Sequence, residues 1–197
     1  NATCADDVAT MDLTINPAAT ALAGSNDDVC SDENYVLSGA SATNYASVSW
    51  ATNGDGTFDI TGDAIKATYI PGAADKLGAT VRLTLTAVGN LPCGNASSFI
   101  DLIVSPAPIA DAGVDATICS DATYNFAGIS SASNYASIAW TSSGDGSFND
   151  ATALNPIYTP GTNDKLGLAP ITLTMRAVGN ATCADDVATM DLTINPA

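Results

Sequence analysis

Two Gly-Asp-Gly segments contain the side chains in this sequence that could bind a metal ion. Oxygen-bearing side chains occupy every second position there, as in the first part of an EF-hand calcium loop. The residues are Asn53, Asp55, Thr57 and Asp59 in the first segment, and Ser143, Asp145, Ser147 and Asn149, with Asp150 adjacent, in the second. No glutamate follows either segment at the distance that an EF-hand requires. Calcium is therefore one interpretation, and a tight turn made by glycine and aspartate is the other.

Five cysteines form a second group with possible chemistry. Cys4, Cys93 and Cys183 precede similar strand-like segments, and Cys30 and Cys119 follow similar acidic ones. The sequence has no histidine and no Cys-x-x-Cys pair, so these residues do not match a zinc site. We therefore predict disulfides, which persist in an oxidising compartment and indicate an extracellular location or the cell surface.

The composition argues against catalysis and against nucleic-acid binding. Without histidine neither a Ser-His-Asp nor a Cys-His arrangement can form, and a glycosidase carboxylate pair would need Glu33, the sole glutamate. The 21 acidic residues outnumber the 5 basic ones and give a net charge of −16, whereas phosphate recognition needs clustered Lys and Arg. No apolar run approaches the roughly 20 residues that span a bilayer. We expect no enzyme, no nucleic-acid partner and no membrane insertion by this segment.

A repeated stretch divides the chain. Residues 1–18 return unchanged as residues 180–197, and residues 90–107 are a weaker copy that keeps the cysteine, the Asp-Leu pair and the Pro-Ala pair. Such identity indicates a tandem array. We predict that residues 1–17 are the last strand of a preceding repeat and that residues 18–106 and 107–197 are two complete repeats.

Both repeats have the pattern of an all-β fold. Short segments with two-residue alternation are separated by turn residues, and no segment has helical spacing of apolar residues. Several short strands around one tryptophan are typical of an immunoglobulin-like β-sandwich. We expect Trp50 and Trp140 in the two cores, with Ala46 and Val48 facing inward beside Trp50.

The cysteines allow two pairing schemes in such a fold. Pairing within repeats would join Cys30 to Cys93 and Cys119 to Cys183, with Cys4 paired outside this segment. These cysteines, however, would lie at opposite ends of a sandwich, and a disulfide needs Cα atoms within about 7 Å. The second scheme therefore joins Cys30 to Cys183 across the two repeats, with Cys4, Cys93 and Cys119 paired to repeats outside this segment. Both schemes remain open at this point.

A resemblance to a known family comes from the segments Trp50 to Phe58 and Trp140 to Phe148. The pattern Trp, Gly-Asp-Gly, Phe, followed by Tyr-x-Pro-Gly and an alternating Leu-Thr strand, resembles polycystic-kidney-disease (PKD) and PKD-like repeats. With its paired cysteine positions, the chain looks most similar to arrays in giant surface adhesins of Bacteroidota, including SprB-like gliding adhesins. The resemblance implies tandem immunoglobulin-like (PKD-like) β-sandwich domains in an extended array.

The resemblance also implies a function. We expect a structural stalk in a long secreted cell-surface adhesin fibre that mediates surface attachment or gliding, with neighbouring repeats of the same chain as partners. One alternative is a multivalent module that binds surface glycans or the substratum, and another is the subunit of a self-assembling extracellular filament. No cofactor is expected apart from the calcium considered above.

Overall fold

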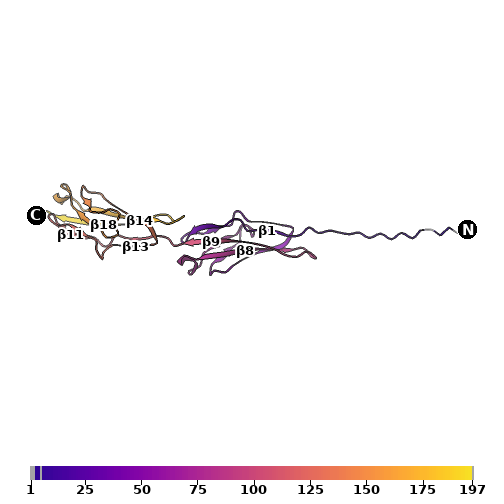
Figure 1. Ribbon diagram of the computed structural model, residues 1–197. Coiled ribbons are helices and arrows are strands. Elements are labelled where there is room, and N and C mark those ends of the chain that lie inside the picture. The colour runs from indigo at the N-terminus through magenta and orange to yellow at the C-terminus, as the bar shows by residue number, and fades with distance from the viewer. Residues whose placement is uncertain (1–2, 5, 197) are drawn as a thin grey trace.

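The structure is a computed structural model that describes residues 3–4 and 6–196. Two similar repeats follow one another end to end, and the two termini lie at opposite ends of the molecule (Figure 1). The first repeat contains β1 (Thr20–Leu22), β2 (Asp27–Cys30), β3 (Tyr35–Val36), β4 (Ser41–Thr43), β5 (Tyr45–Thr52), β6 (Thr57–Asp59), β7 (Thr68–Ile70), the 3-10 turn η1 (Asp75–Leu77), β8 (Thr80–Gly89) and β9 (Ala96–Ser105). The second contains β10 (Ile109–Asp111), β11 (Ala116–Cys119), β12 (Tyr124–Asn125), β13 (Ser131–Ser133), β14 (Tyr135–Ser142), β15 (Ser147–Phe148), β16 (Ile157–Thr159), the 3-10 turn η2 (Asp164–Leu166), β17 (Ile171–Gly179) and β18 (Asp186–Asn195).

The two repeats have the same sheet topology. A four-stranded sheet has the order β2-β9-β8-β5 in the first repeat and β11-β18-β17-β14 in the second. Its first pair is parallel and its other pairs are antiparallel. A three-stranded sheet, β3-β7-β6 or β12-β16-β15, and a two-stranded pair, β1-β4 or β10-β13, complete each repeat. The strand-rich architecture predicted from the alternation is therefore present twice.

The cores form where the alternating strands face inward. In β8 every second residue from Val81 to Ala87 is buried, and in β17 every second residue from Ile171 to Ala177 is buried. Leu83 and Leu173 are fully inaccessible to solvent. Burial of each Val, Leu, Ile or Met side chain in this set contributes about 1.5–3 kcal/mol, so β8 helps to stabilise the first repeat and β17 the second.

The two tryptophans differ in burial. Trp140 is 3% exposed and lies in its core, as predicted, whereas Trp50 is only partly buried and packs at the margin. In the second repeat the backbone N–H of Trp140 donates to Ala151 O (2.8 Å), so the following loop closes over the ring. In the first repeat Ile60 remains 57% exposed in the corresponding loop. The prediction that Ala46 faces inward is wrong, because a β-bulge between Tyr45 and Ser47 shifts the register and leaves Ala46 exposed.

The two identical stretches adopt different structures. Residues 186–195 form β18, in which Met190 and Leu192 are 2% and 0% exposed. In the first copy Met11 and Leu13 are 82% and 74% exposed, and the described residues from 6 to 19 belong to no strand. The strand predicted there is therefore not formed. β18 lies between β11 and β17 in its sheet, whereas none of the described strands pairs with the first copy.

Candidate functional site

Each Gly-Asp-Gly turn is held by a buried aspartate from a 3-10 turn. Asp75 is only 2% exposed. Its carboxylate accepts hydrogen bonds from the N–H groups of Asp55 (3.3 Å), Gly56 (3.0 Å) and Gly72 (3.2 Å) and from Tyr69 Oη (2.5 Å). In return, Asp55 accepts from the N–H groups of Ala74 (2.9 Å) and Asp75 (3.1 Å). A Cβ on Gly54 would lie 2.2 Å from Asp75 Oδ1, so the turn requires glycine there. The turn and the 3-10 segment thus hold each other through two carboxylates.

The second repeat repeats this arrangement. Asp164 receives bonds from the N–H groups of Asp145 (3.0 Å), Gly146 (2.9 Å) and Gly161 (3.0 Å) and from Tyr158 Oη (2.7 Å). Asp145 in turn accepts from the backbone N–H groups of Asn163 and Asp164. Burial by itself would raise the pKa of the Asp164 carboxyl, but the bonds from Tyr158 and the three N–H groups together lower it. Burial, with the hydrogen bond to Asp164, raises the pKa of Tyr158 to about 12.

Most of the side-chain oxygens predicted as calcium ligands accept hydrogen bonds from neighbouring groups of the same repeat. In the first, Asn53 Oδ1 accepts from Arg82 N (2.7 Å), and Asp59 Oδ1 accepts from the N–H and hydroxyl of Thr61. Thr57 lies in β6, and Asp55 is bonded as described above. In the second, Asn149 Oδ1 accepts from Ile157 N (2.7 Å) and Asp150 Oδ1 from the N–H and hydroxyl of Thr152.

This geometry favours the structural interpretation of the two segments. Backbone N–H groups stabilise the charged form of a carboxylate and occupy the oxygens that a cation would need. Within the described part of the chain, no group of three or more Asp, Glu, Cys or His residues is placed to hold a metal ion. The contacts therefore favour the tight-turn interpretation, and the calcium interpretation stays a prediction.

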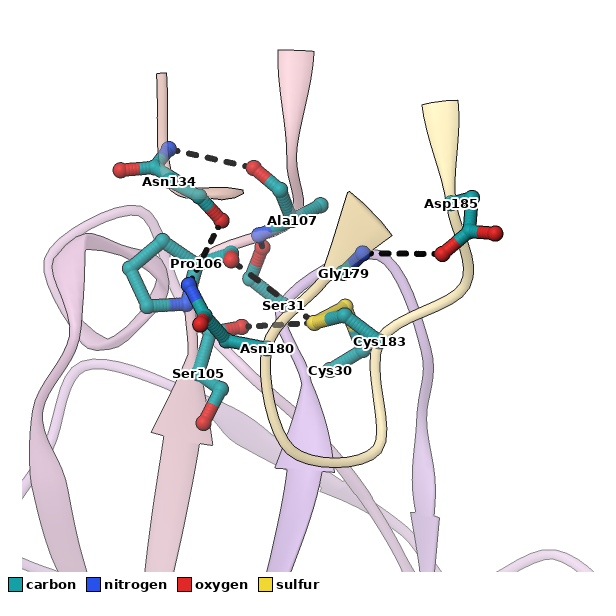
Figure 2. The surroundings of a disulfide bond; sticks show 10 residues. All are labelled: Cys30, Ser31, Ser105, Pro106, Ala107, Asn134, Gly179, Asn180, Cys183 and Asp185. Atoms are coloured by element: carbon teal, nitrogen blue, oxygen red, sulfur yellow. Dashed lines mark hydrogen bonds between the residues drawn. A yellow bond between two sulfur atoms is a disulfide. The ribbon is translucent and has the colours of Figure 1, made fainter. Parts of the chain in front are cut away.

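The junction between the repeats contains a covalent bond. Cys30, at the end of β2, forms a disulfide with Cys183, in the hairpin between β17 and β18, with a Cα–Cα distance of 4.8 Å (Figure 2). The two cysteines are 3% and 8% exposed. Of the two pairing schemes, the structure contains the one across the repeats. The pairs Cys30–Cys93 and Cys119–Cys183 are not formed, because Cys93 and Cys119 are free thiols.

The linker beside the disulfide is fixed by hydrogen bonds from both repeats. Ser31 N donates to Ser105 O (2.8 Å), and Ala107 N donates to Ser31 Oγ (2.9 Å). Cys183 Sγ lies 3.4 Å from Ser105 O. Ser31 is 9% exposed, so its hydroxyl is largely protected from competing water. The residue after Cys30 therefore orders the chain that leads into the second repeat.

Asn134 of the second repeat binds the linker, and Asn180 in turn binds Asn134. Asn134 Nδ2 donates to Ala107 O (3.1 Å), and Asn180 Nδ2 donates to Asn134 O (2.9 Å), as Figure 2 shows. Asn134 has a φ of 56°, a left-handed conformation that asparagine adopts more readily than most residues. Asn44 and Asn90 make the same two bonds in the first repeat, with Ala18 O as the final acceptor. Sequence reasoning missed these residues, although Asn before Tyr recurs at both positions.

Asp185 and Asp186 hold the hairpin that carries Cys183. Asp185 forms an ion pair with Arg176 and accepts a hydrogen bond from Gly179 N (2.9 Å). These contacts lower the pKa of the Asp185 carboxyl, the backbone bond being the larger cause. Asp186 Oδ2 accepts from Ala110 N (2.8 Å), which joins the start of the repeat to its last strand. The acidic pair therefore positions the cysteine for its partner in the preceding repeat.

Comparison with solved structures identifies the class of fold. The N-terminal eight Ig domains of Down Syndrome Cell Adhesion Molecule align over 90% of this chain and 24% of theirs, with a TM-score of 0.55 and 11% identity. Titin fragment I67–I69 aligns over 90% of this chain and 66% of its own (TM-score 0.46, 12% identity), and mouse Cadherin-23 EC22–24 over 90% and 67% (TM-score 0.42, 12% identity). The first of these supports the prediction of tandem immunoglobulin-like β-sandwich domains, which is confirmed. The chain spans about a quarter of that adhesion-molecule fragment.

Sequence comparison found no relative among family models and curated proteins, and the helical segments that the structure describes are too short to span a membrane. No protein-family model matches the sequence, and no curated protein matches it. Both helical segments among the described residues are single 3-10 turns, and neither has the length or the apolar character to cross a membrane.

Proposed function

We propose that this chain is part of a stalk that carries tension in a long secreted cell-surface adhesin fibre used for attachment or gliding. The observation that carries the proposal is the Cys30–Cys183 disulfide between consecutive repeats. An inter-repeat bond of this kind has no use in a flexible linker, but it resists separation of the repeats under load. Its presence also favours an oxidising, extracellular location.

The position of the bond decides how tension passes through the two repeats. A pull on the chain enters the first repeat before β1 and passes along β2 to Cys30. It then crosses the disulfide to Cys183 and leaves along β18. The bonded residues are separated by 153 positions, and everything between them lies in a covalently closed loop. Tension therefore bypasses most of both repeats.

Composition and fold similarity support the same proposal. A net charge of −16 keeps neighbouring fibres apart in solution. One solved structure that shares the fold belongs to a protein whose name describes cell adhesion, and it too contains immunoglobulin domains in tandem. Fold similarity alone does not carry function, so the proposal depends on the junction.

Solution scattering and sedimentation test the proposal against a filament. With Cys93 and Cys119 alkylated, an inert stalk segment should sediment as a monomer at all concentrations, with a maximum dimension that does not change with concentration. Cys30→Ser should broaden the distribution of distances between the repeats, whereas Cys119→Ser, at a free thiol, should leave it unchanged. Concentration-dependent assembly of the oxidised protein with Cys93 and Cys119 alkylated would favour the filament and contradict the stalk.

A recess in the first repeat supports glycan binding as a second candidate function. Val48, Trp50, Phe58 and Ile60 line a hollow of about 370 Å³ at the margin of the sandwich. The Trp50 and Phe58 rings stack with centroids 5.8 Å apart, and a partly exposed aromatic face of this kind suits the apolar face of a sugar ring. Titration of the Trp140→Phe protein with a panel of saccharides, followed by Trp50 fluorescence, tests this candidate. A response that disappears when Phe58 is replaced by alanine, with Trp50 kept as the reporter, supports it, and no response to any saccharide removes it.

A further inference from the structure

Two of the three free thiols among the described residues, Cys93 and Cys119, occupy the same places in their repeats as the two bonded cysteines. Cys93 lies between β8 and β9, as Cys183 lies between β17 and β18, and Cys119 ends β11 as Cys30 ends β2. They lie on opposite outer ends of the two-repeat unit, so they cannot bond to each other within one chain. The internal junction shows what cysteines in these places do when the adjoining repeat is present.

The surroundings of Cys93 match those of Cys183. Cys93 N donates to Asn90 O (2.7 Å), as Cys183 N does to Asn180 O (2.9 Å). The Cys93 thiol lies 3.3 Å from Asn16 O, the counterpart of the 3.4 Å distance from Cys183 Sγ to Ser105 O. The hairpin between β8 and β9 therefore places the free Cys93 thiol as the hairpin between β17 and β18 places the bonded Cys183.

The surroundings of Cys119 match those of Cys30. β11 pairs in parallel with residues 192–195, as β2 pairs with residues 102–105. Ser120 N donates to Asn195 O (2.9 Å), as Ser31 N donates to Ser105 O (2.8 Å). The turn after each cysteine is also closed at the same distance of 3.0 Å, by Ala122 N and by Glu33 N. Cys119 is exposed and accessible to a second cysteine.

The sequence supplies the partner. Because residues 180–197 are identical to residues 1–18, the segment that leaves the second repeat is the segment that leads into the first. A second copy of this chain can therefore follow with its linker unchanged. In that junction Cys119 of one copy and Cys93 of the next take the places of Cys30 and Cys183.

We propose that Cys119 forms a disulfide with Cys93 of the next copy, so that every junction of the array is covalently closed. Formation needs an organic disulfide as oxidant. The thiolate of one cysteine attacks it and expels one thiolate, and the second cysteine then displaces the other from the mixed disulfide. The two cysteines are oxidised, the oxidant is reduced to two thiols, and two protons pass from the cysteines to the products. The inference concerns the chemistry of the junction and stands whether or not the fibre carries tension.

The test uses a protein in which residues 1–179 are followed by residues 1–197, which reproduces the repeat sequence without an added linker. The protein is incubated with oxidised glutathione, remaining thiols are alkylated, and digestion at aspartate places Cys93 and Cys119 on separate peptides. We expect a Cys119–Cys93 crosslinked peptide in addition to the Cys30–Cys183 peptide.

Two matched variants identify which copies are joined. Cys93→Ser in the second copy should abolish the crosslink, so that Cys119 is recovered only in alkylated form. The same substitution in the first copy should leave the crosslink in full yield. The inference is overturned if no Cys119–Cys93 crosslinked peptide is found, and Cys119 is recovered only alkylated or bonded to glutathione, while the Cys30–Cys183 peptide is formed.

Discussion

Replacing Cys30 with serine should lengthen the fully extended chain by about 550 Å under tension. The bond joins positions 153 residues apart, and each extended residue spans about 3.6 Å. The loop closed by the disulfide therefore cannot extend while the bond is intact, and about 550 Å of chain stays folded or slack. In a single-molecule stretching experiment with both ends anchored, the oxidised protein should release only the segments before Cys30 and after Cys183. The Cys30→Ser protein should release the rest as well.

The control and the refuting result use the same instrument. Cys119→Ser removes an exposed free thiol and should extend like the unaltered protein, whereas Cys183→Ser should extend like Cys30→Ser. Addition of reductant during stretching should convert the short extension into the long one. If the oxidised, unaltered protein releases the extra 550 Å or so before reduction, tension does not bypass the repeats and the reasoning fails.

Three further predictions concern the turns and their carboxylates. Gly54→Ala should lower the free energy of unfolding, measured by urea denaturation, by about 2 kcal/mol, because the new Cβ would lie 2.2 Å from the buried Asp75 carboxylate. Gly62→Ala is the control, because a Cβ there would meet no atom within 4 Å. It should change the free energy of unfolding by less than about 0.5 kcal/mol. The folded state lowers the pKa of Asp164, so the carboxylate stabilises the fold fully above its unfolded pKa of about 4, and this stabilisation is lost as the pH falls toward the folded pKa. Asp164→Asn should therefore flatten the decrease in the free energy of unfolding at acid pH. An unchanged decrease would contradict this role of Asp164. A chelator should leave the melting temperature unchanged, because N–H groups occupy Asp55 and Asp145, whereas a rise on adding calcium would restore the metal interpretation.

Local chemistry made most of the fold predictable. Two-residue alternation in residues 81–87 and 171–177 marks one buried face, and the structure buries those residues. The exposure of Ala46 was not predictable, since a bulge changes register without changing the alternation. The different structures of the two identical stretches show that the strand state depends on neighbouring strands, because the same side chains are exposed in one copy and buried in the other.

The site was predictable only in part. Sequence reasoning reduced the disulfides to two schemes by asking which ends of two sandwiches meet, but the choice required the placement of Cys30 beside Cys183. The calcium hypothesis relied on the spacing of oxygen atoms along the chain. That spacing carries no information about Asp75, whose carboxylate comes from a distant loop and collects the N–H groups of the turn.

The central claim is that a disulfide joins consecutive repeats, and peptide mapping without reduction tests it most directly. After alkylation, digestion at aspartate places Cys30, Cys93 and Cys183 on three separate peptides. The structure predicts a crosslinked peptide containing Cys30 and Cys183, with Cys93 alkylated. A peptide that joins Cys30 to Cys93, or Cys119 to Cys183, would contradict the account.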